Sequence, residues 1–228
     1  MKVRLGTVTA LAAELDCLRS LPADERSVRC FGMGPEAAGK AASELLEEGC
    51  TALLSFGLAG GLDPRLRPGN VVVAEAIVTD RGELFSTDSA WRKRVIQRLT
   101  MGSVVSEGRL VASDRPLLTV EEKRATARAS QAVAVDMESH AVARAAQRSG
   151  VPFMAIRAVA DPAERVVPAW LVGVIGSDGR PRLHKLAAGA LANPLDLPQL
   201  FKLARDQRAA LAALSRVALD AGPLFALG

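Results

Sequence analysis

Carboxylates follow apolar segments at two points of this sequence, where packing alone does not call for them. Residues 132–138 (AVAVDME) begin as an apolar run typical of a buried strand and end in Asp136 and Glu138. An unpaired carboxylate away from water is costly. Glu138 therefore either caps the helix expected next or holds a ligand. A second apolar run, residues 152–160, is followed directly by Asp161.

A third carboxylate, Glu14, lies in the segment ALAAEL near the N-terminus. Each of these acids has an ordinary explanation when taken alone. Asp161 could be a helix N-cap before Pro162, and Glu14 could be a first-turn acid that complements a helix dipole. Three carboxylates at the ends of apolar elements are harder to explain in this way, which favours a shared role in binding a ligand.

Two glycine-rich segments are further candidates for a binding site. Residues 57–61 (GLAGG) match neither the GxGxxG nor the P-loop pattern, so both a tight turn and a nucleotide-binding loop stay open. Gly32 and Gly34 precede a predicted helix, where backbone N–H groups can bind an anion. Ligands of open α/β sheets lie beyond the carboxyl ends of the strands. The ends of the strands near residues 57, 136 and 161 are therefore expected to converge.

The elements that must position these residues alternate along the chain. Continuous apolar strands between helices indicate an α/β layer fold with a parallel or mixed sheet. A single domain over residues 1–228 is expected, with a glycine-rich segment at 170–182 and a C-terminal helical extension at about 183–228. Strands are predicted at 3–9, 27–31, 51–56, 70–78, 103–112, 132–138 and 152–160, and helices at 10–19, 36–48, 120–129, 139–149 and 196–221.

Composition excludes several classes of protein. The 228 residues are 49% apolar, which suffices for a sizeable core without disulfide bonds. The net charge of +4 is spread along the chain, and aromatic residues are few, so nucleic acid is not an expected partner. Three cysteines without paired spacing indicate a reduced, cytoplasmic protein. No signal peptide or spanning segment of about 20 apolar residues is evident, although contact with the inner membrane surface stays open.

The two histidines, His140 and His184, do not stand in the spacing of a metal site or a Ser-His-Asp triad. A zinc site or a catalytic triad is therefore not expected. The sequence also implies no metal and no organic cofactor.

Five of these segments together resemble the superfamily of purine nucleoside phosphorylases and methylthioadenosine/S-adenosylhomocysteine nucleosidases. The resemblance covers residues 2 to about 168 and implies a three-layer α/β/α fold around a central mixed, twisted sheet. It depends on residues 9–14 (TALAAE), 32–34 (GMG), 56–62 (FGLAGGL), 135–139 (VDMES) and 157–161 (RAVAD).

Three further segments narrow the resemblance to the hopanoid-associated phosphorylase branch. That branch is taken to remove adenine from adenosylhopane during hopanoid side-chain synthesis. The segments are residues 136–143, 160–163 and 178–180.

The resemblance assigns roles to the candidate residues. Asp161 would protonate or hydrogen-bond the purine at N7, and Glu14 would activate the attacking water. Glu138 would accept hydrogen bonds from the ribose hydroxyls, while Met137 would pack against the sugar. The remaining expected site residues are Leu58 and Gly60 for substrate, and Gly32, Gly34 and Ser55 for phosphate or water.

Two departures from the family pattern bear on the nucleophile. Leu58 replaces a frequent serine, and Ser55 stands where hexameric phosphorylases carry a phosphate-binding arginine. Without these two side chains the anion site would bind phosphate less firmly, which favours water as the nucleophile. Phosphate stays open as a co-substrate. Residues 113–117 also lack the aromatic on which nucleosidases commonly stack the base.

Three alternatives remain beside adenosylhopane cleavage: a methylthioadenosine/S-adenosylhomocysteine nucleosidase, a generic purine nucleoside phosphorylase and a non-catalytic nucleoside-binding protein. A hydrophobic 5′ substituent could be sheltered near Trp170, Leu171, Val174 and Leu200, which could equally be ordinary packing residues. A homo-oligomer is implied by the resemblance.

Overall fold

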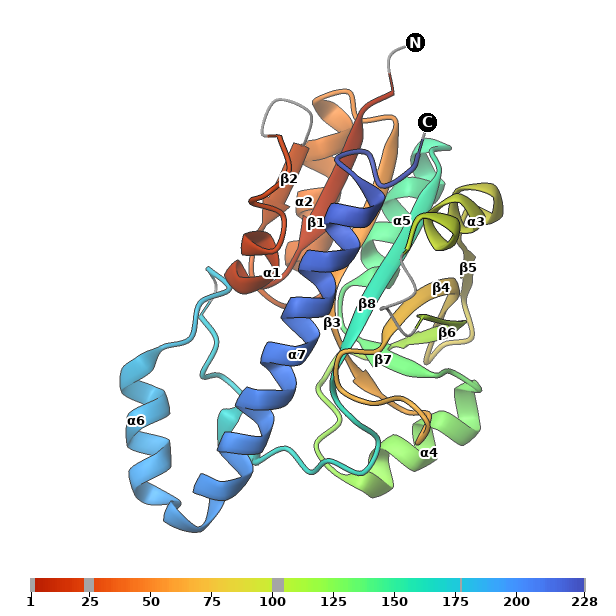
Figure 1. Ribbon diagram of the computed structural model, residues 1–228. Helices are drawn as coiled ribbons and strands as arrows, with labels where there is room; N and C mark the ends of the chain where they lie inside the picture. Colours follow the sequence, from red (N-terminus) through yellow and green to blue (C-terminus); the bar gives the residue numbers. More distant parts are fainter. Residues whose placement is uncertain (1–2, 23–26, 100–104, 177, 228) are drawn as a thin grey trace.

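The computed structural model describes residues 3–22, 27–99, 105–176 and 178–227. A central sheet lies between helices on both faces, with α7 (Leu197–Ala221) on one face and α2 (Pro35–Glu47) and α5 (Ser139–Ser149) on the other (Figure 1). This is the predicted three-layer α/β/α arrangement around a mixed sheet.

Eight strands from the described residues make up the sheet. Their order is β2-β1-β3-β7-β6-β4-β5, and β8 pairs with both β3 and β4. The strands β3, β7, β6, β4 and β8 therefore close into a ring. The bounds are β1 Leu5–Thr9, β2 Ser27–Cys30, β3 Ala52–Gly61, β4 Val71–Thr79, β5 Leu84–Ser86, β6 Val105–Ala112, β7 Ala134–Asp136 and β8 Phe153–Asp161.

The remaining described α-helices are short, with 5 to 11 residues each. Among the described helices, none is both long and apolar enough to cross a membrane. Their bounds are α1 Ala12–Asp16, α3 Ser89–Arg98, α4 Val120–Ser130 and α6 Leu183–Ala192, with 3₁₀ turns at Ala169–Leu171 and Pro194–Asp196.

Two apolar clusters fill the space on either side of the sheet. One joins α2 and α5 to the sheet, and α2 presents Ala38, Ala41, Ala42 and Leu45 to it, as its helical spacing predicts. The other joins α3 and α7 to the opposite face, around Trp91. Burying one such leucine side chain stabilises the fold by about 1.5–3 kcal/mol. The packed helices therefore hold in place the strands that carry the site.

The segment 57–61, for which a tight turn and a binding loop were the expected alternatives, is instead the end of a strand. Strand β3 runs through to Gly61 and pairs in parallel with β8, with an irregularity between Ala59 and Gly60. Glycines fit this part of the strand because strand β8 lies close against it. A Cβ atom at Gly61 would lie 3.1 Å from a methyl of Val159.

Other differences from the sequence predictions are local. The predicted helix at 10–19 is only α1, and α3 was not predicted because its polar sequence buries only Trp91 and Val95. Asp161 does not cap a helix, since β8 ends there in a turn. Positions 103 and 104 of a predicted strand lie outside the described residues.

Candidate active site

A cavity of about 240 Å³ lies at the carboxyl ends of β3 and β8, next to the segment that follows β7. Strands from distant parts of the sequence meet here, as the rule for ligand sites in α/β sheets predicts. A larger hollow of about 590 Å³ lies between α2 and α5, but none of the predicted site residues lines it. The predicted residues that line the smaller cavity are Glu14, Leu58, Gly60, Met137, Glu138 and Asp161.

Glu14 is buried in α1 and accepts three backbone hydrogen bonds. Oε2 accepts from the N–H groups of Ala10 at 2.8 Å and Leu11 at 2.9 Å, and Oε1 accepts from Leu58 N–H at 2.8 Å. The first two bonds cap the helix, and the third ties its carboxylate to the end of β3. Burial raises the pKa of Glu14, although Arg157 and these N–H groups oppose the shift.

Gly57 makes room for that carboxylate. A Cβ atom at position 57 would lie 2.5 Å from Oε1 of Glu14, closer than atoms can approach. The glycine-rich end of β3 therefore has a spatial function at this position, which is to let a strand backbone approach a buried acid.

Asp161 is held by a lysine that the sequence analysis did not identify. Lys123 on α4 is almost completely buried, and its Nζ lies 2.5 Å from Oδ2 of Asp161. The same ammonium donates to the carbonyls of Pro162 at 3.1 Å and Arg165 at 3.0 Å, so each of its three protons has an acceptor. Burial raises the pKa of Asp161, with the charge of Lys123 acting against it.

Glu138 does not cap the helix that it precedes. Its Oε1 accepts from the N–H of Gly34 at 2.9 Å. Asp136 serves the start of α5 instead, because its Oδ1 accepts from Ser139 N–H at 3.2 Å and Glu138 N–H at 3.3 Å. Of the two roles considered for Glu138, the geometry therefore favours holding a ligand.

Burial, followed by the charge of Asp136, raises the pKa of Glu138 to about 7. The carboxyl is thus poised to change its charge near neutral pH.

Arg157 neutralises part of this cluster from the middle of β8. Its Nε donates to Oδ2 of Asp136 at 2.6 Å, and one terminal nitrogen donates to Ser55 Oγ at 2.7 Å and Ser139 Oγ at 3.0 Å. Ser139 also donates to Asp136. An arginine within an apolar strand is the sequence signal for this network, and Arg157 was predicted only as part of the motif at residues 157–161.

The carboxylates outnumber the arginine at this end of the cavity. Burial alone would lower the pKa of Arg157, but Asp136, Glu138 and Glu14 outweigh it and raise the pKa. Three acids thus surround one cation, which leaves little attraction for a further anion.

The predicted phosphate or water residues lie behind the cavity wall rather than on it. Gly32, Gly34 and Ser55 do not line the cavity. Ser55 is buried and bonded to Arg157 and Ser139, and the N–H of Gly34 is engaged by Glu138.

Apart from the acids and Arg115, the lining of the cavity is largely apolar. It includes Pro116, Leu117 and Leu118, which follow the segment where an aromatic was missing, together with Val167. Trp170, Leu171, Val174 and Leu200 lie outside this lining, and Trp170 donates instead to Asp196 at 2.8 Å.

The histidines stand apart from this chemistry. His140 is buried on α5, and burial lowers its pKa, while His184 is exposed on α6. Within the described ranges, no group of three or more His, Cys, Asp or Glu side chains is placed to hold a metal ion.

Comparison with known proteins gives a consistent result. A family model described as the phosphorylase superfamily matches residues 19–192. Among solved structures, a methylthioadenosine/S-adenosylhomocysteine nucleosidase from Neisseria meningitidis in complex with methylthio-immucillin-A is 17% identical. It covers 99% of this chain and 100% of its own, with a TM-score of 0.75.

Two further structures share the fold over nearly the whole chain. The corresponding nucleosidase from Colwellia psychrerythraea, in complex with adenine, is 18% identical, with coverage of 100% and 96% and a TM-score of 0.73. The futalosine hydrolase of Helicobacter pylori is 16% identical, with coverage of 95% and 97% and a TM-score of 0.68.

Proposed function

The chain belongs to the phosphorylase superfamily, and we propose that it cleaves the N-glycosidic bond of an adenine nucleoside with water as the nucleophile. The observation that supports this most strongly is the meeting of three separately held carboxylates, Glu14, Glu138 and Asp161, at one cavity. Cleavage of this bond builds positive charge on the sugar and negative charge on the departing base. It therefore calls for an acid near the base and carboxylates near the sugar.

Each carboxyl has an environment suited to one of these tasks. Asp161, whose pKa is raised by burial, would hydrogen-bond or protonate N7 and accept from the 6-amino group of adenine. Glu138 would accept from the ribose hydroxyls beside Met137, and Glu14 would orient and deprotonate water. A general acid beside the purine and a general base beside the water correspond to the two carboxyl groups of an inverting glycosidase.

The electrostatics of the sugar side favour water over phosphate. Arg157 is fully engaged by Asp136, Ser55 and Ser139, and the N–H of Gly34 already serves a carboxylate. Arg115 also lines the cavity, but it is paired with Glu122 at 2.6 Å. A phosphate dianion would be repelled by Glu14 and Glu138, whereas neutral water meets no such repulsion.

For the substrate itself, we propose adenosylhopane, whose 5′ substituent is a large hydrocarbon. The apolar part of the cavity lining, including Leu11, Met33 and Val167, supports a hydrophobic group beyond the sugar. Methylthioadenosine is the second candidate, favoured by the neighbouring nucleosidase structures and by the modest volume of the cavity.

Adenine release from adenosylhopane and from methylthioadenosine, each with and without phosphate, tests this proposal. We expect release from adenosylhopane at the same rate in both conditions, because water is the nucleophile. Strict dependence on phosphate would contradict hydrolysis. A preference for methylthioadenosine would contradict the hopanoid substrate, and absence of release from either would contradict the reaction.

The pH dependence of kcat/KM tests the role of Glu138. Its carboxyl must be ionised to accept from both ribose hydroxyls, and its pKa is raised to about 7. We therefore expect kcat/KM to increase as the pH rises through about 7. In Glu138→Gln the limb near pH 7 should be lost and kcat/KM should be low throughout, and any acid limb that remains would belong to Glu14. Glu36→Gln, at an exposed position on α2, should keep the limb near pH 7. An unchanged limb in Glu138→Gln would refute the assignment.

A further inference from the structure

The segment 180–203, here called the hairpin, exposes an unusual amount of apolar side chain. It consists of α6, the following 3₁₀ turn and the first turns of α7. Seven of the eleven exposed large apolar side chains in the described ranges lie between Val166 and Phe201. The most exposed belong to the hairpin: Leu195 at 93%, Leu191 at 83%, Phe201 at 76% and Leu183 at 70%.

The core does not explain these residues. Helix α6 buries none of its side chains, and α7 buries none before Asp206. Leu197, Leu200 and Leu203, on the first turns of α7, are therefore not buried in the core. In Figure 1, α6 and the start of α7 extend away from the sheet. Large apolar side chains left exposed over one segment point to an interaction site.

The hairpin is built to hold this shape. The ring of Trp170 packs so closely on α6 that a Cβ atom at Gly189 would lie 2.2 Å from it. The same indole donates to Asp196 at 2.8 Å, and the side-chain amide of Gln199 donates to the carbonyl of Val166. Trp170, which precedes the hairpin, therefore packs against it, while the leucines of the hairpin stay exposed.

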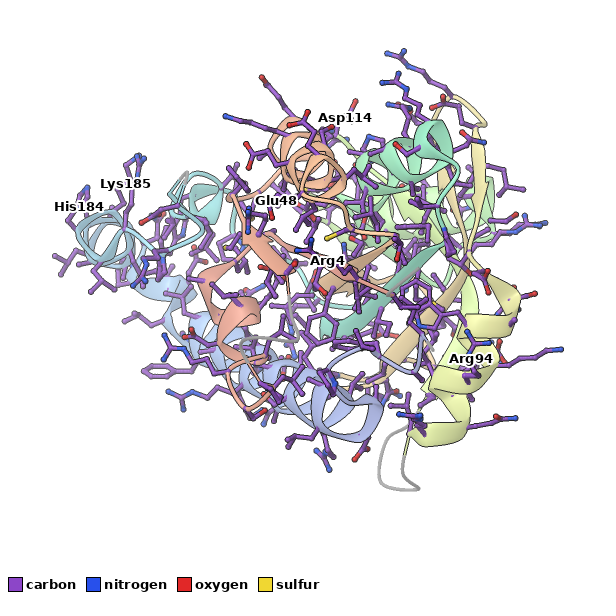
Figure 2. All side chains as sticks on the ribbon, turned by 90° about the horizontal axis from the view of Figure 1, so that it is seen from above. Arg4, Glu48, Arg94, Asp114, His184 and Lys185 are labelled. Carbon is purple, nitrogen blue, oxygen red and sulfur yellow. The ribbon has the colours of Figure 1, made fainter. Side chains whose placement is uncertain are left out.

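The same segment carries a net positive charge. Residues 180–203 contain four basic residues, all exposed, and one acid, Asp196, which is half-buried against Trp170. Their formal charge is +3. Figure 2 shows Lys185 at the outer edge of the molecule, beside His184. The other three basic residues are Arg180, Arg182 and Lys202.

We propose that the hairpin docks on the surface of a lipid bilayer that contains anionic phospholipids. Leucines and a phenylalanine would enter the boundary between head groups and acyl chains, and the surrounding cations would contact lipid phosphates. A second copy of the chain fits less well, because a symmetric contact would bring +3 against +3 with no exposed carboxylate in the hairpin to offset it.

The base of the hairpin lies beside the candidate active site. The N–H of Ala12 donates to the carbonyl of Gly179 at 3.1 Å. A Cβ atom at Gly179 would lie 3.1 Å from Cα of Leu11, a residue that lines the cavity. Docking would thus bring the cavity toward the bilayer, although the docking itself does not depend on the proposed reaction.

Flotation of the full chain with vesicles tests the proposal. We expect binding to vesicles of phosphatidylcholine with phosphatidylglycerol, and weaker binding as salt is added, because salt screens surface charge. The substitutions Arg182→Gln, Lys185→Gln and Lys202→Gln together should lower the partition coefficient on the order of a hundredfold, at a few-fold for each cation. The combined Leu191→Ser, Leu195→Ser and Phe201→Ser variant should lose binding.

Controls distinguish this result from non-specific hydrophobic adsorption and from self-association. Leu84→Ser with Leu219→Ser, at exposed apolar positions elsewhere, should bind vesicles as the unchanged protein does. If the triple serine variant fails to fold by circular dichroism, Leu195→Ser alone replaces it. Failure of the unchanged protein to bind anionic vesicles, or equal binding by the hairpin variants, would overturn the proposal. So would a lower mass of the hairpin variants by light scattering without lipid, since the surface would then join copies of the chain.

Discussion

Replacing Asp161 by asparagine is expected to slow adenine release by about 10²–10⁴-fold, the contribution typical of a positioned acid. Asparagine keeps the shape of the side chain but can no longer supply a proton to N7. Its amide oxygen can still accept from Lys123, and that lysine retains two carbonyl acceptors, so we expect the fold to persist. The measurement is kcat/KM for adenine release, together with the circular dichroism spectrum.

The matched control is Asp80→Asn, which makes the same change at an exposed position. It should leave kcat/KM unaltered. Full activity of Asp161→Asn would mean that the base leaves without help from this carboxyl, and the assignment of Asp161 would then be wrong.

Replacing Arg157 by methionine is expected to lower the free energy of unfolding by about 3–5 kcal/mol. The substitution leaves Asp136 buried without its cation and removes the donors to Ser55 and Ser139. It also removes a charge that lowers the pKa of Glu138, so the acid limb of kcat/KM should move above pH 7 in any variant that remains folded. Urea denaturation at neutral pH measures the stability.

Two further variants distinguish loss of the ion pair from a general effect of changing a strand. Arg109→Met makes the same substitution at an exposed position of β6 and should change stability by no more than about 0.5 kcal/mol. Adding Asp136→Asn to Arg157→Met should restore part of the loss, because it removes the unpaired charge. If Arg157→Met were as stable as Arg109→Met, the buried network would not support the fold.

Much of the fold could be predicted because its signals are local. The small residues of α2 recur at helical spacing, and β8 is an apolar run interrupted only by Arg157 before its final Asp161, so both were found close to their observed bounds. Helix α3 was missed because its sequence is polar, and the hydrogen bond that its Trp91 makes at 2.6 Å goes to the carbonyl of Phe225, far along the chain. The end of β3 was misjudged because glycine signals a turn unless a neighbouring strand is known.

The candidate site, too, was predicted only in part from the sequence. Glu14, Glu138 and Asp161 were identified from their positions after apolar segments, and the structure places all three on one cavity. Lys123 was not identified, because an isolated lysine within EEKRATARAS resembles a solvated helix face. Only its near-complete burial against Asp161 distinguishes it from its exposed neighbours.

By itself, the sequence determined the α/β class, most strand and helix positions and the three acids to consider, because periodicity and the cost of burying charge act on neighbouring residues. The tertiary structure decided which charges meet. Gly34 reaches Glu138 across 104 positions, and Ser55 reaches Arg157 across 102. Coulomb energies and pKa values depend on distance and burial, and neither is defined until the strands are placed side by side.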